Sequence, residues 1–306
     1  MNVFGEKWSF TSFGESHGKA IGGVLDGVPA GLHVDLEMIR EELLRRKGVT
    51  GDGLQVTGVS VRAMNEPDEV EWLSGVMDGI TLGTPIAFII RNKDARPEDY
   101  EYLKHTYRVG HADKVYEQKY GIRDWRGGGR ASARETAARV VAGCLAKQEL
   151  AAKGVTIHAL LVQVGAETDP AKFAETIAAY QREGDSIGGI VECRIEGLPV
   201  GTGEPIFDKL QAHLAFAIMS INACKGFEYG TGFGGVTQPG SATNGISGGI
   251  AGGISDGSDV VFRCVFKPTP STPKAGVKGR HDACVATRAV PVVEAMTALS
   301  LVNLLD

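Results

Sequence analysis

The order in which β-rich and helical stretches follow one another limits the possible folds of this chain more than any other feature. Runs rich in β-branched and aromatic residues occur at 8–13, 22–25, 56–62, 85–91, 156–165, 189–195 and 260–267. Several of these runs precede the first long helical pattern, so strands and helices do not alternate as they do in a doubly wound parallel sheet. This order predicts a layered α+β fold.

Apolar residues recur at helical spacing in five places, at 37–47, 132–153, 172–182, 205–223 and 291–305. The last of these helices is expected to carry Pro291 in its first turn. No stretch has the composition of a linker and no repeat of fixed period is present, so residues 1–306 are predicted to form a single domain. The apolar stripes of the last two helices fit either a core or a subunit interface.

Composition excludes several functional classes. A content of 43% hydrophobic and 23% charged residues is typical of a globular protein, and a formal charge of −5 argues against a general nucleic-acid binder. The chain shows neither a signal-peptide pattern nor about 18 successive apolar residues, which predicts a cytoplasmic protein without a membrane span. The five cysteines are scattered and lack metal-ligand spacing, so we expect reduced, mostly buried thiols and no metal site.

Two short motifs suggest functions that their context contradicts. Residues 14–18 fit the G-x-S-x-G pattern of a hydrolase nucleophile, but too little chain precedes Ser16 to build the sheet that such a serine follows. Residues 230–235 fit G-x-G-x-x-G, but a predicted helix precedes them and no helix can follow, which excludes a dinucleotide site. A serine hydrolase stays an alternative that labelling of Ser16 by a phosphonate would support.

Glycine is the compositional outlier, with 42 residues, and it serves either tight turns or close approach of main-chain N–H groups to a ligand. Both interpretations apply to residues 127–129, which precede a predicted helix. Ser132 and Glu135 have capping-box spacing, so this helix is expected to begin at Ser132 and to favour an anion at its start. The arginines at 123, 126, 130, 134 and 139 indicate that the anion is multivalent.

Two later segments also carry polar groups that could bind an anion or transfer a proton. "VFKPTPSTP" ends a strand in Lys267 and offers hydroxyl groups on a proline-stiffened loop, which suits a phosphate. "GRHDAC" brings Arg280, His281 and Asp282 together, and a histidine beside an aspartate can transfer protons near neutral pH.

Together, "FGESHG", "GHAD", "KYGIRDWRGGGRASARETAARV", "GDSIGG", "MSINACKG", "GGIAGGISDGSD", "KPTPS" and "GRHDACVATRAVPVVEAM" resemble the chorismate synthase family, in the family's order and over almost the whole chain. The resemblance implies a β-α-β sandwich with a helical centre flanked by mainly antiparallel sheets. It also implies a lyase that converts 5-enolpyruvylshikimate 3-phosphate to chorismate and phosphate with reduced FMN and no net redox change.

The resemblance also assigns catalytic roles. His17 resembles the proton donor to the leaving phosphate, and His111 resembles the histidine that protonates the reduced flavin. Asp282 resembles the aspartate that works with the flavin in removing the substrate proton. Ser16 and Ser132 resemble serines that assist by hydrogen bonding. Imidazole suits both histidine roles, since it exchanges protons near neutral pH.

Binding residues follow from the same resemblance. The implied flavin contacts are Arg130, Ala131, Ser132, Asn222, Ala223, Gly252, Lys267, Pro268, Thr269, Pro270, Ser271 and Arg280. The implied contacts to substrate anions are Arg46, with Arg40, Arg45 and Arg134 in support. Arginine presents a bidentate fork to carboxylate and phosphate, so lysine would replace it poorly.

The chain departs from the family pattern in several places. "KGVTGDGLQV" follows Arg46 where the family has further arginines, Ala283 stands where proline is usual, and the segments near 236–247 and 272–279 are short. A noncatalytic flavin- or anion-binding module on the same scaffold is therefore an alternative. The family further implies a homotetramer, and NADPH as a possible source of reducing equivalents for some members.

Overall fold

The N-terminal part of the chain supplies one antiparallel sheet. The structure is a computed structural model that describes residues 2–48, 61–243, 245–277 and 281–305. Along β7, Ile86, Phe88 and Ile90 are buried and alternate with more exposed residues, which gives the sheet one apolar face. The strands lie in the order β1 (Val3–Phe4), β2 (Ser9–Phe13), β3 (Ala20–Asp26), β7 (Ile86–Arg91) and β4 (Val70–Ser74).

A second antiparallel sheet comes from the C-terminal half. Its strand β9 shows the same alternation, with Val191, Cys193 and Ile195 buried. The strands lie in the order β10 (Cys224–Tyr229), β13 (Val260–Phe266), β9 (Gly189–Glu196) and β8 (Thr156–Val164), and every neighbouring pair is antiparallel.

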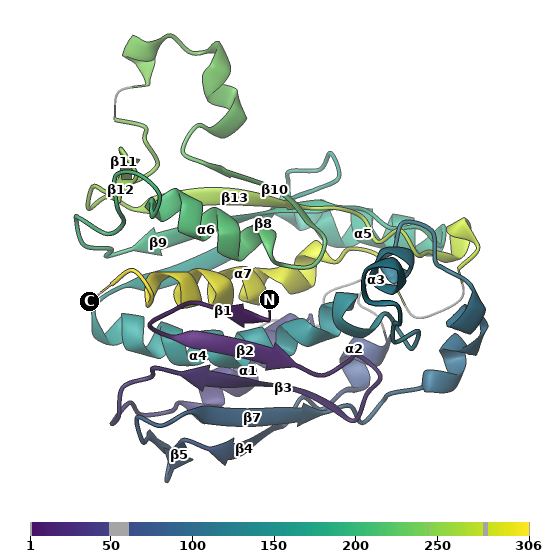
Figure 1. Ribbon diagram of the computed structural model, residues 1–306. Coiled ribbons are helices and arrows are strands. Elements are labelled where there is room, and N and C mark those ends of the chain that lie inside the picture. The colour runs from purple at the N-terminus through teal and green to yellow at the C-terminus, as the bar shows by residue number, and fades with distance from the viewer. Residues whose placement is uncertain (1, 49–60, 244, 278–280, 306) are drawn as a thin grey trace.

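Helices fill the space between the two sheets (Figure 1). The long helices α4 (Thr136–Ala152) and α7 (Ala286–Leu301) pack against each other, α4 facing β3 and α7 facing β8 and β9. They approach closely because Gly143 has no side chain: a Cβ there would lie 2.3 Å from the Cβ of Ala295. Helices α1 (Leu36–Arg46) and α6 (Leu210–Met219) pack on α7. The arrangement confirms the expected α+β sandwich with a helical centre.

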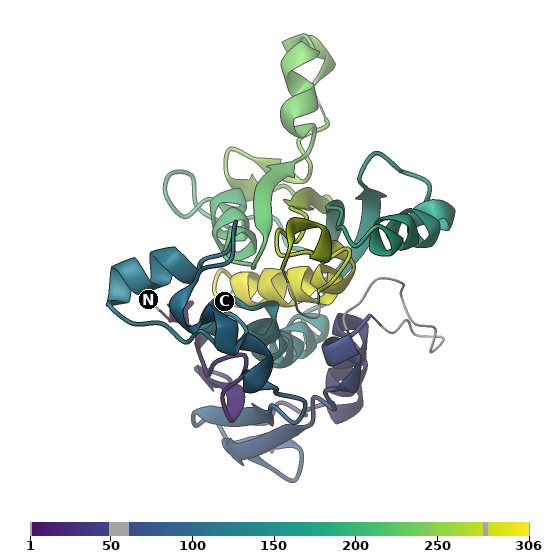
Figure 2. The same ribbon diagram turned by 90° about the vertical axis from the view of Figure 1, so that its right-hand side faces the viewer.

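Smaller elements surround this body. The smaller helices are α2 (Val61–Asn65), α3 (Asp113–Tyr120) and α5 (Phe173–Arg182). Two short hairpins are formed by β5 (Val76–Met77) with β6 (Ile80–Thr81) and by β11 (Ile250–Ala251) with β12 (Ile254–Ser255). The 3₁₀ turns include η1 (Pro97–His105), η2 (Gly129–Ala131), η3 (Ala133–Glu135) and η7 (Pro273–Ala275). An arm carrying η5 (Gly232–Thr237) and η6 (Gly240–Ala242) projects from the second sheet (Figures 1 and 2). Within the described ranges, no helix has the length and apolar character that crossing a membrane requires.

Several predicted elements need correction. Helix α7 begins at Ala286, so Pro291 lies inside the helix rather than in its first turn. The helix expected at 205–223 is confined to α6, because its last turn ends at Ser220 and Ala223 adopts a left-handed φ of +67°. Of the strand expected at 56–62, residues 56–60 lie outside the described residues, and Val61 begins the short helix α2 instead.

Candidate active site

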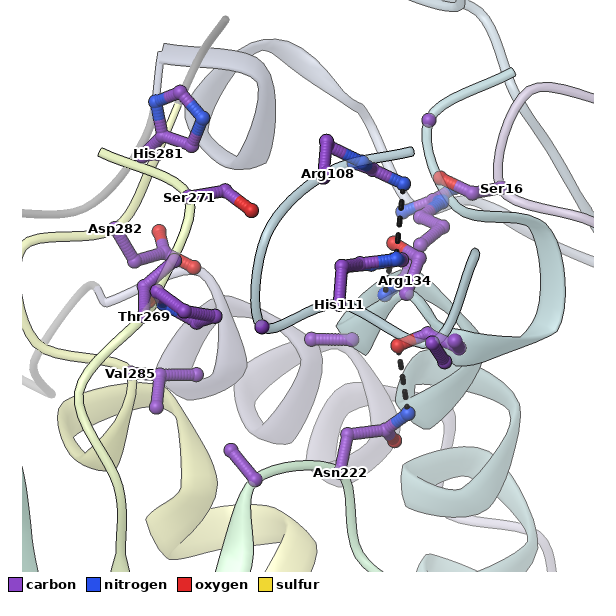
Figure 3. Close-up of a pocket in the computed structure, with 18 of the residues that line it drawn as sticks. Ser16, Arg108, His111, Arg134, Asn222, Thr269, Ser271, His281, Asp282 and Val285 are labelled. Atoms are coloured by element: carbon purple, nitrogen blue, oxygen red, sulfur yellow. Dashed lines mark hydrogen bonds between the residues drawn. The ribbon is translucent and has the colours of Figure 1, made fainter. Parts of the chain in front are cut away.

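A cavity of about 430 Å³ lies where the segments that precede α4 and α7 meet loops from both sheets. Figure 3 shows Ser16, His111 and Asp282 around this hollow, although they come from distant parts of the chain. The starts of two long helices face the cavity, and helix N-termini favour anions. The lining comprises Ser16, Ala63, Glu66, Tyr100, Arg108, Gly110, His111, Ala112, Tyr116, Gly127, Ala131, Ser132, Ala133, Arg134, Asn222, Ala223, residues 267–271, His281, Asp282, Val285 and Arg288.

His17 is buried just behind the lining. Its Nδ1 accepts a hydrogen bond from the backbone N–H of Arg96 at 3.1 Å, so the ring proton of the neutral imidazole belongs to Nε2. Tyr100 packs edge-on against the ring, with centroids 4.7 Å apart. On the pocket side stands Gly127, where a Cβ would lie only 2.1 Å from the His17 Cδ2. Only glycine at position 127 leaves the ring in this place.

His111 is held by a similar arrangement. Its Nδ1 lies 2.9 Å from Oδ1 of Asp113, the first residue of α3, and Arg108 donates to the same carboxylate. A Cβ at Gly128 would lie 2.8 Å from the His111 Cε1. The glycine run at 127–129 therefore makes room for two histidine rings. The steric role is a finding that sequence reasoning, which considered turns and anion contacts, did not reach.

The arginines of the pocket already have acidic partners. Arg134 forms ion pairs with the buried Asp68 and Glu66, and Arg288 donates to Oδ2 of Asp282 at 2.6 Å. Arg46 lies below the pocket, fully buried, and donates to Oγ1 of Thr136 at 2.9 Å. Burial lowers the pKa of Arg46 to about 9, and the positive charge of Arg288 acts in the same direction.

Two polar atoms of the expected flavin contacts are buried without a hydrogen-bond partner in the described structure. Oδ1 of Asn222 and Oγ of Ser271 are buried and accept or donate no hydrogen bond among the described residues. The amide nitrogen of Asn222 donates to the carbonyl of Ala131 at 3.2 Å, which fixes the side-chain orientation. Ala223 completes this wall in its left-handed conformation, a rare one for a residue with a side chain.

Ser132 does not form the predicted capping box. Its Oγ accepts from the backbone N–H of Arg134 at 3.3 Å and begins the 3₁₀ turn η3, while α4 proper starts at Thr136. The Glu135 side chain turns away to pair with Arg139, one helical turn further on. Ser132 is nonetheless in the pocket lining, as expected.

Several predicted site residues are not in the lining. Arg40 is exposed and pairs with Glu37, and Arg45 is bound by Glu42 and Glu294 on the far side of α1. His17 and Arg46, described above, are also outside the lining, as are Gly252, in the turn between β11 and β12, and Arg130, whose guanidinium donates to Ser12 and Gly14. Arg280 lies outside the described residues.

Sequence reasoning missed other residues of the site. Arg108, Asp113 and Arg288 lie within motifs that we considered, but their roles emerge only from the pairs they form with His111 and Asp282. Glu66 and Tyr100 had no distinguishing sequence signal, because they reach the pocket from segments with ordinary composition.

Comparisons with known proteins find one family over almost the whole chain. A family model described as chorismate synthase matches residues 8–305. The chorismate synthase of Christiangramia forsetii is 46% identical over 350 aligned positions, covering 99% of this chain and 96% of that protein. The enzyme of Phocaeicola vulgatus is 45% identical over 356 positions, covering 99% and 97%. Both alignments are longer than this chain of 306 residues, so the relatives carry residues that it lacks.

The fold has a counterpart of the same description among solved structures. A chain described as a crystal structure of chorismate synthase superimposes with a TM-score of 0.78 at 30% sequence identity, covering 98% of this chain and 92% of that chain. The likeness therefore extends over both sheets and the helical layer between them.

Proposed function

The chain belongs to the chorismate synthase family, whose members are lyases of aromatic amino acid biosynthesis, and from this premise we propose that it eliminates phosphate from 5-enolpyruvylshikimate 3-phosphate to form chorismate. The observation that supports the proposal best is the convergence of Ser16, His111, Ser132 and Asp282 around one cavity. The reaction is an anti 1,4-elimination: a C–H bond and the C–O bond to phosphate break, and the phosphate leaves with the electron pair of the C–O bond.

The pocket fits reduced FMN as the cofactor. The unsatisfied atoms of Asn222 and Ser271 would each cost about 1–3 kcal/mol if they stayed unpaired, so a ligand with polar edges suits them. When bound, reduced FMN would supply transient electron density to the breaking C–O bond, with no net redox change. The residues that would hold it are Ala131, Ser132, Asn222, Ala223 and 267–271, with Lys267 as a cation for its phosphate.

The two histidines are the proton-carrying groups of the proposed mechanism. Nε2 of His17 holds the ring proton because Nδ1 accepts from Arg96, and this proton would go to the leaving phosphate. His17 lies behind the lining, where its ring packs against Gly127. His111 lies in the lining itself and would serve as the acid toward the cofactor. A general acid of this kind contributes roughly 10²–10⁴ in rate.

Asp282 is proposed to take part in removal of the substrate proton. Arg288 donates to its Oδ2 at 2.6 Å, which holds the carboxylate in the lining of the pocket. Ser16 and Ser132 are proposed to orient groups by hydrogen bonding rather than to attack the substrate. Arg134 is proposed to contact a carboxylate or the phosphate of the substrate, and the segments that precede α4 and α7 to favour these anions.

The decisive experiment is turnover under anaerobic conditions. Purified protein with photoreduced FMN is expected to release phosphate from the substrate and to form chorismate in equal amounts. His111→Ala should lower this rate by roughly 10²–10⁴. His213→Ala is the matched control, because His213 is a partly exposed histidine that pairs with Asp208 outside the lining. Absence of chorismate from the unchanged protein would refute the proposal.

The shorter chain favours one alternative, a noncatalytic flavin- or anion-binding module. Its relatives align over 350 positions or more, and this chain has 306 residues. Titration of reduced FMN distinguishes the two functions, since tight flavin binding without phosphate release would identify the module.

Two further proposals concern assembly and reduction. We propose a homotetramer in the cytoplasm, supported by the exposed Phe216, Phe233 and Val236 near the projecting arm and by five free, buried thiols. Light scattering on the purified protein measures the assembly. NADPH is proposed as a source of reducing equivalents only through an outside reductase, so NADPH and oxidised FMN alone should give no turnover.

A further inference from the structure

Asp113 lies at the centre of a buried hydrogen-bonded group that includes His111. Its Oδ2 accepts from the backbone N–H of Arg108 at 3.1 Å and from the Arg108 Nε at 2.9 Å. Its Oδ1 accepts from Nη2 of Arg108 at 2.8 Å and lies 2.9 Å from Nδ1 of His111. The Asp113 side chain is only 2% exposed, so solvent does not compete for these bonds.

The ionisation of Asp113 determines which histidine nitrogen carries the proton. Burial alone would raise the pKa of the Asp113 carboxyl, but hydrogen bonds from Arg108 and His111 outweigh burial and hold this pKa well below its usual range. The group is therefore a carboxylate, which can only accept. Nδ1 of His111 lies 2.9 Å from Oδ1 of Asp113 and 3.2 Å from Nη2 of Arg108, which can only donate, so the two contacts compete for Nδ1. The shorter contact is to a carboxylate that can only accept, and it favours the tautomer in which Nδ1 donates its N–H to Asp113.

The ring has little freedom to choose another orientation. A Cβ at Gly128 would lie 2.8 Å from Cε1 and 2.9 Å from Nε2 of His111, so the ring lies directly against the backbone of the glycine run. Lys267, which follows β13, lies in the same lining, with its Nζ 3.5 Å from the carbonyl oxygen of Gly110. Among the described residues, the charged groups near the ring include Arg108, Asp113 and Lys267.

We propose that Asp113 is a positioning residue that holds the proton of His111 on Nδ1, so that Nε2 is the nitrogen that exchanges a proton within the pocket. Arg108 fixes the carboxylate by occupying three of its acceptor positions. The inference rests on the proposed function only for what the exchanged proton does; the tautomer itself is a property of the protein without substrate or flavin.

The tautomer is measured directly by nitrogen NMR of protein labelled with ¹⁵N-histidine, with no flavin present. The His111 signals are assigned as those lost in His111→Gln. At a pH where the ring is neutral, the unchanged protein should show the proton on Nδ1. A proton on Nε2 would overturn the inference, whatever the activity of the enzyme.

The variant Asp113→Asn keeps the shape of the side chain and removes its charge. Either orientation of the carboxamide places an N–H group against a donor of Arg108, so the fixed arrangement is lost and the Nδ1–H population of His111 should fall. The value of kcat for chorismate formation should drop by roughly 10²–10⁴ with little change in KM. An unchanged tautomer, or an altered tautomer with unchanged kcat, would contradict a positioning role.

A second pair in the chain provides the control. Asp208 lies 3.0 Å from Nε2 of His213 on the surface, with the same two residue types. Asp208→Asn should leave kcat and the His111 signals unchanged. If the unchanged protein shows Nδ1–H but makes no chorismate, the lyase proposal fails and the position of the His111 proton stands. If Asp113→Asn does not fold, the tautomer in the unchanged protein still decides.

Discussion

Gly127→Ala tests whether the glycine run exists to accommodate His17. Gly127 has φ of +60°, and an added Cβ would lie 2.1 Å from Cδ2 and 2.5 Å from Nε2 of the His17 ring. A left-handed conformation costs an L-residue roughly 1–2 kcal/mol, and overpacking a buried site costs a further 1–3 kcal/mol or so. The variant should therefore lose about 2–5 kcal/mol of unfolding free energy.

Gly154→Ala is the matched control for this loss. Gly154 has φ of +79°, but nothing lies within 4 Å of an added Cβ. Its substitution carries the backbone cost alone, roughly 1–2 kcal/mol, so the difference between the variants isolates the contact with His17. Urea unfolding followed by intrinsic fluorescence gives both free energies.

The ring of His17 has one way to relieve the contact. If it swings aside, the loss of stability approaches that of the control, but the hydrogen bond from Arg96 to Nδ1 breaks and the proposed acid is misplaced. Turnover should then fall by roughly 10²–10⁴. Equal stability and equal turnover in Gly127→Ala and Gly154→Ala would refute the reasoning.

Three other changes test separate parts of the structure. Burial alone would raise the pKa of Glu294, but Arg45 and Lys147 hold this pKa below its usual value. Glu294→Gln should therefore lower the unfolding free energy by about 3–5 kcal/mol at neutral pH. In the unchanged protein the contribution of Glu294 is lost as pH falls through the lowered pKa, and unfolding curves of the variant should no longer show that loss. Arg40→Ala should leave kcat and KM unchanged, since its guanidinium is exposed and pairs only with Glu37 in the described structure; a severalfold rise in KM would return Arg40 to the site. Ser271→Ala should stabilise the ligand-free protein, because it removes a buried hydroxyl without a hydrogen-bond partner. The same change should weaken FMN binding roughly 2- to 10-fold in a fluorescence titration. Unchanged FMN affinity would contradict a flavin contact.

The sequence predicted the layers of the fold because their signals are local. Runs of β-branched and aromatic residues identified β7 and β9, and helical spacing identified α4 and α1. Local signals fail where a tertiary contact decides the conformation. The extent of α6 could not be predicted from the helical pattern at 205–223, because the backbone turns at Ala223 to reach the pocket wall.

The basic residues of α1 show a second limit. Arg45 and Arg46 are neighbours in sequence, but successive residues point about 100° apart around a helix. Arg46 consequently faces the buried space under the pocket, while Arg45 meets Glu294 of α7 on another side. A local sequence pattern does not show when a cation pairs with an acid from a distant element. The arginine cluster in the sequence therefore does not tell which arginines are already paired with acids of the protein.

The acidic partners change how the pocket must bind an anion. Arg134 is paired with Asp68, Arg288 with Asp282 and Arg108 with Asp113, so these cations bring little net charge to the cavity. We expect a substrate with several negative charges to be attracted by Lys267 and by the segments that precede α4 and α7. Fixed dipoles need no reorganisation when charge moves to the leaving phosphate, whereas a mobile ion pair would have to break. The paired arginines are therefore best suited to holding Asp282 and His111 in place.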